Sequence, residues 1–216
     1  MPEKGFDANF SLAPIAACLV REGYTFVVRY YNVNTPSKNL TPVEARDLVR
    51  AGLRLVAVWE NGYPNHAGYF NHATGVHDGA VAYHYGSQTI GQPFDCPIYF
   101  AADYDASEAD IDGPVTAYFR GIADVFALIS SRTPGQPVYR VGVYGSGLTC
   151  SKLLAAGLVT YTWLSQSTGF RGSRTFHDYN LKQLAEKIVC EKKGDPDETN
   201  PPRDPGTFVV AVPAEG

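Results

Sequence analysis

Residues 97–105 read Pro-Ile-Tyr-Phe-Ala-Ala-Asp-Tyr-Asp, an apolar run that ends in two carboxylates, and this is the clearest strand that the sequence predicts. Residues 24–31 form a second run of this kind, without clean polar alternation at its centre, as is typical of a parallel strand covered on both faces. Six further strand candidates lie along the chain: residues 5–8, 53–60, 138–144, 161–166, 179–184 and 190–195.

Segments with helical signals separate most of these strands. Thr41-Pro42-Val43-Glu44 has the pattern of a capping box with proline at the first helical position. Apolar residues at helical spacing from Val115 to Ile129 predict a long helix that Thr133-Pro-Gly closes. The other expected helices cover residues 14–22, 77–90 and 149–156, with a strand as the alternative for the second.

Eight strands alternating with helices, without a break in composition, predict one domain over residues 1–216. The expected fold class is α/β, a single compact (β/α)8 TIM barrel in which some helices are short or missing, because such barrels need at least ~200 residues. A doubly wound open sheet is the alternative. It would normally carry a glycine-rich first turn, which Gly5-Phe-Asp7 does not provide.

Composition argues against several classes of partner. The chain carries 18 basic and 22 acidic residues without a cluster of Lys or Arg, so no nucleic-acid or anionic-lipid surface is expected. Its apolar runs are far shorter than the ~20 residues of a transmembrane helix, and residues 1–10 lack a secretory signal pattern. The sequence predicts a soluble protein whose oligomeric state stays open.

Metal and cofactor sites are not expected. The cysteines Cys18, Cys96, Cys150 and Cys190 form no CxxC pair, and the histidines form no HxH or HExxH pattern. Buried thiols are the simplest interpretation of the cysteines. One or two disulfides of unknown pairing are the alternative in an oxidising compartment.

Carboxylates recur where the predicted strands end. The candidate catalytic residues are Asp7, Glu60, Asp103 and Asp105. Crowded carboxylates raise one another's pKa, which separates a proton donor from an ionised partner, as hydrolysis of a glycosidic bond requires. A helix cap or an ion pair is the alternative use of any one of them, above all of Asp105.

Aromatic and polar residues near the same strand ends are candidates for holding a sugar. Aromatic rings stack on sugars by their apolar faces, although aromatic residues at strand ends are equally typical of a core. The candidate substrate-binding residues from this reasoning are Arg29, Tyr31, Trp59, Tyr144, Trp163 and Gln166.

Several motifs resemble the glycoside-hydrolase-like family first described as domain of unknown function 1906. They are Lys4-Gly-Phe-Asp7, Val28-Arg-Tyr30, residues 97–105, Gly142-Val-Tyr-Gly145, Trp163-Leu-Ser-Gln166 and Asp195-Pro-Asp-Glu-Thr-Asn-Pro201. The resemblance implies a TIM barrel distantly similar to family 25 lysozymes, which cleave peptidoglycan. It also implies an exported or envelope-directed protein.

The same resemblance assigns positions to individual residues. Family 25 lysozymes carry an Asp on the first strand, which Asp7 matches, and Asp-x-Glu on the fourth, which Asp103-Tyr-Asp105 matches except for its last residue. Glu60 could supply the longer carboxylate. Gln183 and Asp195 are implied at the ends of the last two strands as polar residues of the rim.

The leading hypothesis is a glycoside hydrolase that acts on peptidoglycan or a related cell-wall polysaccharide. Glu60 would be the general acid/base, Asp103 the nucleophile or the group that orients an acetamido substituent, and Asp7 and Asp105 would tune its charge. One alternative is a barrel that binds glycan without cleaving it. Another is a metal-dependent phosphoesterase.

Overall fold

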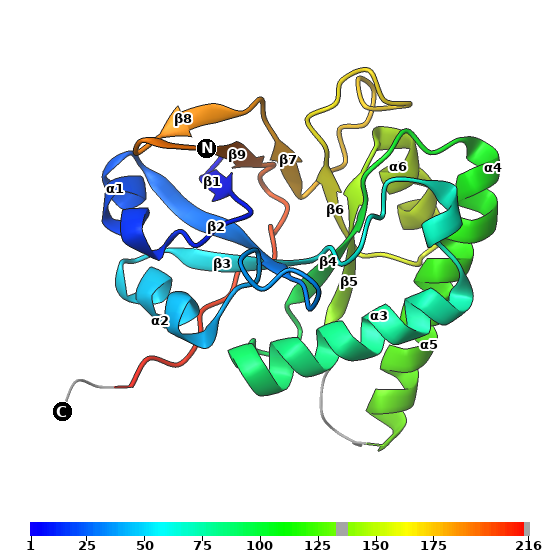
Figure 1. Ribbon diagram of the computed structural model, residues 1–216. Coiled ribbons are helices and arrows are strands. Elements are labelled where there is room, and N and C mark those ends of the chain that lie inside the picture. Colours follow the sequence, from blue (N-terminus) through cyan, green and yellow to red (C-terminus); the bar gives the residue numbers. More distant parts are fainter. Residues whose placement is uncertain (133–137, 214–216) are drawn as a thin grey trace.

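The strands of the computed structural model, which describes residues 1–132 and 138–213, form a sheet that closes into a barrel (Figure 1). Strands β1 to β7 follow one another around the barrel in sequence order, and β9 lies between β7 and β1. The strands are β1 (Lys4–Asp7), β2 (Tyr24–Tyr31), β3 (Arg54–Trp59), β4 (Pro97–Ala102), β5 (Arg140–Gly145), β6 (Tyr161–Leu164), β7 (Leu181–Gln183), β8 (Lys187–Val189) and β9 (Lys192–Thr199). The predicted closed eight-stranded barrel is confirmed.

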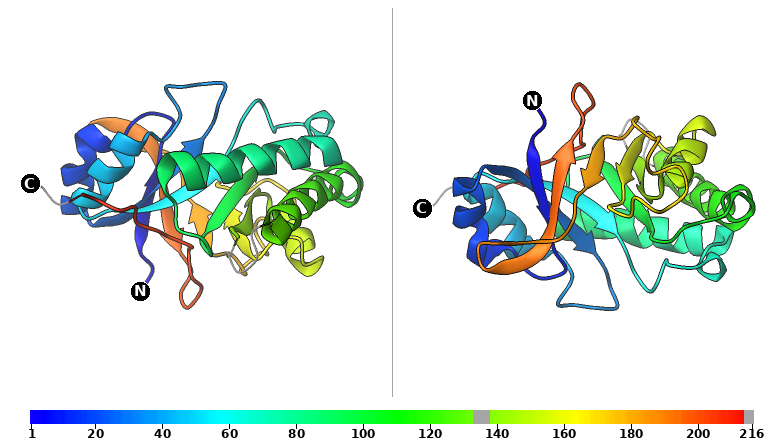
Figure 2. Two further views of the ribbon diagram at one scale, coloured as in Figure 1. Left: turned by 90° about the horizontal axis from the view of Figure 1, so that it is seen from below. Right: turned by 90° about the horizontal axis from the view of Figure 1, so that it is seen from above.

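The closing strand differs from that of a regular (β/α)8 barrel. Neighbours from β1 to β7 pair in parallel, whereas β9 is antiparallel to both β7 and β1. The reason is the short connection, since β8 and β9 form a hairpin and a parallel return would need a crossover of a dozen or more residues. In the described part of the chain β8 pairs only with β9, so it lies outside the ring; the right-hand view of Figure 2 shows the β8–β9 hairpin in orange from above.

Helices cover the outside of the barrel on the β1–β6 side. They are η1 (Ala13–Ile15), α1 (Ala16–Arg21), α2 (Pro42–Arg50), η2 (Ala67–Tyr69), α3 (His72–His84), η3 (Tyr85–Ile90), α4 (Glu108–Asp110), η4 (Ile111–Val115), α5 (Thr116–Arg132) and α6 (Gly147–Ala155). The expected helices are confirmed, with the one expected over 77–90 beginning at His72 and ending in the π-helical turn η3. The predicted stop at Thr133-Pro-Gly lies outside the described residues.

Two helices make the closest contact of the outer layer. α3 and α5 run side by side across one face of the barrel (Figure 1). A Cβ on Gly75 of α3 would lie 2.0 Å from the carbonyl oxygen of Tyr118, and one on Gly121 of α5 would lie 2.2 Å from that of His72. Glycine at these two positions therefore allows the helix backbones to touch.

Alternation along the strands produces two cores. Phe26, Val28, Val56, Tyr99 and Trp163 fill the inside of the barrel, whereas the residues between them on each strand pack outward under the helices. A disulfide between Cys18 and Cys190 ties α1 to the turn of the β8–β9 hairpin. In the described part of the chain no helix is long and apolar enough to cross a membrane.

Candidate functional site

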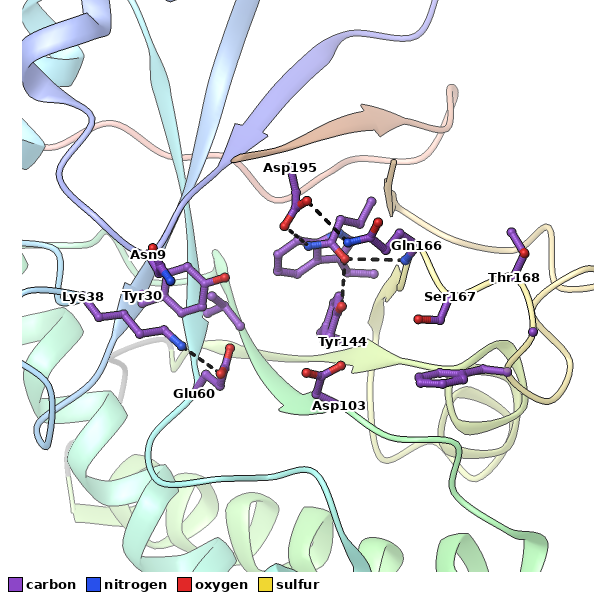
Figure 3. Close-up of a pocket in the computed structure, with 15 residues that line it drawn as sticks. Asn9, Tyr30, Lys38, Glu60, Asp103, Tyr144, Gln166, Ser167, Thr168 and Asp195 are labelled. Carbon is purple, nitrogen blue, oxygen red and sulfur yellow. Dashed lines mark hydrogen bonds and ion pairs between the residues drawn. The ribbon is translucent and has the colours of Figure 1, made fainter. Parts of the chain in front are cut away.

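A cavity of about 780 Å³ opens at the barrel end where the parallel strands finish (Figure 3). Active sites of such barrels lie at this end. The residues that line the cavity are Asn9, Tyr30, Lys38, Val58, Glu60, Asp103, Tyr144, Trp163, Gln166, Ser167, Thr168, Gly169, Phe170, Gln183 and Asp195. The structure thus brings together seven of the predicted site residues: Glu60, Asp103, Tyr144, Trp163, Gln166, Gln183 and Asp195.

Glu60 and Asp103 have different surroundings on the same wall of this pocket. Lys38 Nζ lies 2.8 Å from Glu60 Oε1 and 4.1 Å from the centre of the Tyr30 ring. The Asp103 side chain has no hydrogen bond or ion pair within the described residues. Partial withdrawal from water raises the pKa of Asp103, the negative charge of Glu60 adds to the shift, and Lys38 opposes it. Glu60 is therefore paired with a cation, whereas the pKa of Asp103 is raised and its carboxyl has no ion-pair partner among the described residues.

Asp7 lies under the pocket, fully buried inside the barrel. Its carboxyl accepts hydrogen bonds from Tyr30 Oη at 3.0 Å and Gln183 Nε2 at 2.7 Å, and Gln183 Oε1 accepts one from Tyr144 Oη at 2.8 Å. Burial raises the pKa of Asp7 to about 7; the charges of Asp195 and Glu60 act in the same direction, and the two hydrogen bonds oppose them. Asp7 therefore exchanges a proton near neutral pH, and it contacts the pocket through Tyr30 and Gln183.

A second buried carboxyl, Asp197, was not among the predicted site residues. Its Oδ1 accepts a hydrogen bond from Trp163 Nε1 at 2.9 Å, and its Oδ2 has no hydrogen-bond partner among the residues that the structure describes. Burial and the charge of Asp7 raise the pKa of Asp197 well above the usual value. Asp197 follows Asp195 by two residues on β9, and residues two apart on a strand face the same side of the sheet. This spacing is the sequence signal that could have identified Asp197.

Asp195 stands at the rim, near the start of β9 rather than at its end, because β9 runs antiparallel. Asp195 nevertheless lies at the rim of the barrel, as expected, because it pairs with Asp7 at the end of β1. Gln166 Nε2 and Gln183 Nε2 lie 3.4 and 3.5 Å from its carboxylate. Partial burial, and then the charge of Glu186, raise the pKa of Asp195.

Three predicted sugar-binding residues lie on the opposite face of their strands. The guanidinium of Arg29 is buried under α2, where its Nε lies 2.7 Å from Glu44 Oε1. Tyr31 Oη donates to Gln92 Oε1 at 2.7 Å, and Trp59 packs in the outer core. The expectation that these residues hold a sugar is corrected. Each lies one position away from an inward-facing residue of its strand, so its side chain faces the helices and not the pocket.

Asp105 is also outside the pocket. It accepts hydrogen bonds from the backbone N–H of Arg171 at 2.7 Å and from its Nη1 at 3.0 Å, so it ties the β6–β7 loop to the end of β4. Ser107 and Asp110 form the capping box of the helix that follows. The ion-pair alternative applies to Asp105, and its expected place in a catalytic cluster is corrected.

The inward-facing residues that sequence reasoning missed follow the same alternation. Asp7 pairs with Val28 in the β1–β2 register, so Tyr30 is the next inward position at the end of β2. Lys38 and Phe170 come from loops, where no periodicity marks a residue. Within residues 1–132 and 138–213, no three His, Cys, Asp or Glu side chains are placed to hold a metal ion.

Comparison with known proteins gives this geometry a family. The model of the Rv2525c-like, glycoside hydrolase-like domain matches residues 17–193. The chain belongs to this family. FadG of Bacillus subtilis, an uncharacterized protein, is 30% identical over 163 residues, which cover 73% of this chain and 27% of FadG. The chain therefore spans about a quarter of the length of this family relative.

Solved structures share the fold of this family member. Rv2525c of Mycobacterium tuberculosis, a Tat-secreted protein crystallised with L-tartrate, superposes with a TM-score of 0.77 at 21% identity, over 95% of this chain and 98% of that one. A bacterial lysozyme from Streptomyces coelicolor gives a TM-score of 0.54 at 14% identity, over 92% of both chains. The chain thus has a glycoside hydrolase-like fold that resembles the lysozymes.

Proposed function

We propose that the chain hydrolyses a cell-wall glycan, peptidoglycan or a related polysaccharide, with Glu60 and Asp103 as the acid–base pair. The observation that carries this proposal is the unequal setting of two carboxyl groups on one wall of the pocket. Glu60 has a lysine at 2.8 Å, whereas Asp103 has none and its pKa is raised. Such inequality is what acid–base cleavage of a glycosidic bond uses.

The surroundings favour a division of roles that differs from the sequence-based hypothesis. Asp103 would donate a proton to the leaving oxygen, and Glu60, which is paired with Lys38, would act as base or nucleophile. Asp7 would act through Gln183 and Tyr30 as a positioning residue, because its carboxyl does not line the cavity. Trp163 and Tyr144 would offer apolar surface to the sugar.

The test is release of reducing ends from purified peptidoglycan by the wild-type chain and two isosteric variants. Glu60→Gln and Asp103→Asn should each lower the rate by about 100-fold or more, since a positioned acid or base typically contributes that much. Asp47→Asn, which removes an exposed carboxylate on α2, is the matched control and should leave the rate unchanged. Full activity in either site variant would remove that residue from the proposed mechanism.

A glycan-binding barrel without turnover is the second candidate. It is favoured by Asp105, which stands where family 25 lysozymes carry a glutamate and is bound to Arg171 instead of facing the cavity. A carbohydrate array in which wild type retains a glycan that it never cleaves would support this candidate. Cleavage of any retained glycan, lost in Asp103→Asn, would decide for the hydrolase.

We further propose that the chain works outside the reducing cytosol. Two observations support this: the Cys18–Cys190 disulfide, which is typical of oxidising compartments, and the similarity to the Tat-secreted Rv2525c. A mass measurement of the native protein under non-reducing conditions should find two free thiols, those of Cys96 and Cys150. Four free thiols would contradict the proposal.

A further inference from the structure

We propose that, among glycans of the proposed kind, the pocket prefers those with a free amino group, a 2-amino-2-deoxy sugar whose ammonium pairs with Asp195. This inference rests on the proposed function, because it names the substrate class of the same pocket. It makes Asp195 a specificity-determining residue that is separate from the acid–base pair.

The charges of the pocket wall are the first support. Among the described residues that line the cavity, the ionisable groups are Lys38, Glu60, Asp103 and Asp195, apart from the phenols. Lys38 is already engaged with Glu60 at 2.8 Å. Asp103 and Asp195 have no cation within ion-pair distance in the described chain. The carboxylate of Asp195 would therefore attract an ammonium group of a ligand.

The contacts of Asp195 are the second support. Its two hydrogen bonds, from Gln166 and Gln183, are long at 3.4 and 3.5 Å. Charge-assisted N–H···O bonds are typically 2.7–2.9 Å, so the carboxylate has not yet made its strongest bond. The nearby cation Lys193 lies 2.5 Å from Glu186 and is engaged there. Asp195 can therefore still accept a short bond from a ligand.

The place of Asp195 is the third support. Figure 3 shows it across the pocket from Glu60 and Asp103, with Tyr144 between the two sides. Asp195 comes from β9, whereas the other two follow β3 and β4. An ammonium held at Asp195 would thus leave the reacting carboxyls free. Acetylation of the amino group would remove this ion pair.

The experiment compares two oligosaccharides by calorimetry, the β-1,4-linked tetramer of glucosamine and its fully N-acetylated form. Wild type should bind the amino form about tenfold more tightly, the worth of one charge-assisted hydrogen bond. The preference should shrink between ~20 and ~200 mM salt, because screening weakens an ion pair at a half-exposed carboxylate. Melting curves confirm that each variant is folded.

Asp195→Asn should abolish the preference for the amino form over the acetylated tetramer. Asp47→Asn is the control, since it removes an exposed carboxylate on α2 that does not line the cavity and leaves the Lys193–Glu186 pair intact, and it should keep the preference. Asp195→Glu retains the charge and should restore part of the preference. An unchanged preference in Asp195→Asn would overturn the assignment of Asp195.

The outcomes separate this inference from the proposed function. Equal or tighter binding of the acetylated tetramer by wild type would overturn the preference for amino sugars. If wild type then cleaves the acetylated tetramer and Asp103→Asn does not, the proposed hydrolase function would still hold. Binding of neither tetramer, together with no reducing ends from peptidoglycan, would overturn both.

Discussion

Arg29 and Glu44 form an ion pair that water does not reach. Arg29 also donates to the carbonyl oxygen of Ala8, and Glu44 Oε1 accepts from the backbone N–H of Leu12 at 2.9 Å. Glu44 is therefore not the second half of a capping box at α2; Thr41 caps the helix alone. The pair joins β2, α2 and the chain after β1.

Arg29→Met should lower the free energy of unfolding by about 3–5 kcal/mol, because it leaves the charge of Glu44 buried without a partner. Arg50→Met is the control: it breaks an exposed pair on the same helix and should cost ~0–1 kcal/mol. Urea unfolding measures both. Equal losses in the two variants would contradict the structural role of Arg29.

The buried carboxyl of Asp7 makes stability depend on pH. Its pKa is about 7 in the folded chain and near 3.9 when unfolded, so the folded state binds the proton more tightly. This contribution is fully present below pH ~4 and is lost as the pH rises through ~7. It amounts to about 4 kcal/mol at most.

Wild type should therefore lose stability between pH ~4 and ~7 more steeply than Asp7→Asn, which carries no titrating group at this position. Urea unfolding at several pH values measures the two slopes. Asp47→Asn, with its exposed carboxylate, should keep the wild-type slope. Identical slopes in wild type and Asp7→Asn would contradict a raised pKa at Asp7.

The phase of a strand is what residue-scale sequence reasoning missed. The sequence predicts where the strands end, but Arg29, Tyr31 and Trp59 face away from the barrel interior, whereas Tyr30 faces inward. A strand covered on both faces carries apolar residues on each side, so hydropathy does not show which side is inner. Asp7 faces inward and pairs with Val28 on β2, so the residue two positions after Val28, Tyr30, also faces inward.

At the scale of elements, the β8–β9 hairpin carries Asp195, which lines the pocket, and Asp197, which is buried inside the barrel. Asp195 and Asp197 lie on β9, and the hairpin turn is tied to α1 by the Cys18–Cys190 disulfide. The 172-residue separation between the two cysteines means that the link closes most of the chain. It therefore restricts the unfolded state strongly.

Replacing both cysteines by serine should lower the free energy of unfolding by about 2–5 kcal/mol. Urea unfolding of the oxidised wild type and the double variant measures this. Cys96→Ser removes a free thiol and serves as the control, with a smaller effect expected. If reduced and oxidised wild type unfold at the same urea concentration, the disulfide does not stabilise the fold.

The sequence predicted the order of strands and helices because apolar runs, caps and turn residues are local signals. It did not predict the direction of β9, because parallel and antiparallel strands share one hydropathy pattern. The connection decides the direction: β8 and its turn replace a crossover helix. The sequence also did not predict which cysteines pair, because Cys18 and Cys190 come together only when β9 closes the barrel against β1.

At the scale of the whole molecule, the closed ring gives the chain two concentric cores. Trp163 lies inside the barrel and Trp59 lies between the barrel and its helices. Every strand of the ring contributes side chains to the inside, and closure by β9 completes it. Both cores pack against the two faces of the same sheet, so loss of that sheet would disrupt both of them.

This arrangement tests the prediction of one domain over residues 1–216. Trp59 and Trp163 are the two tryptophans of the chain, so Trp59→Phe and Trp163→Phe each leave one probe, in the inner and the outer core respectively. Within each variant, urea transitions followed by tryptophan fluorescence and by far-ultraviolet circular dichroism should coincide, as for a two-state domain. Comparison inside a variant removes the effect of the substitution on stability. If the barrel and its helices form one domain, loss of the shared sheet must destroy both cores together. Different urea midpoints for fluorescence and circular dichroism in either variant would show instead that the barrel and the helices unfold as separate units.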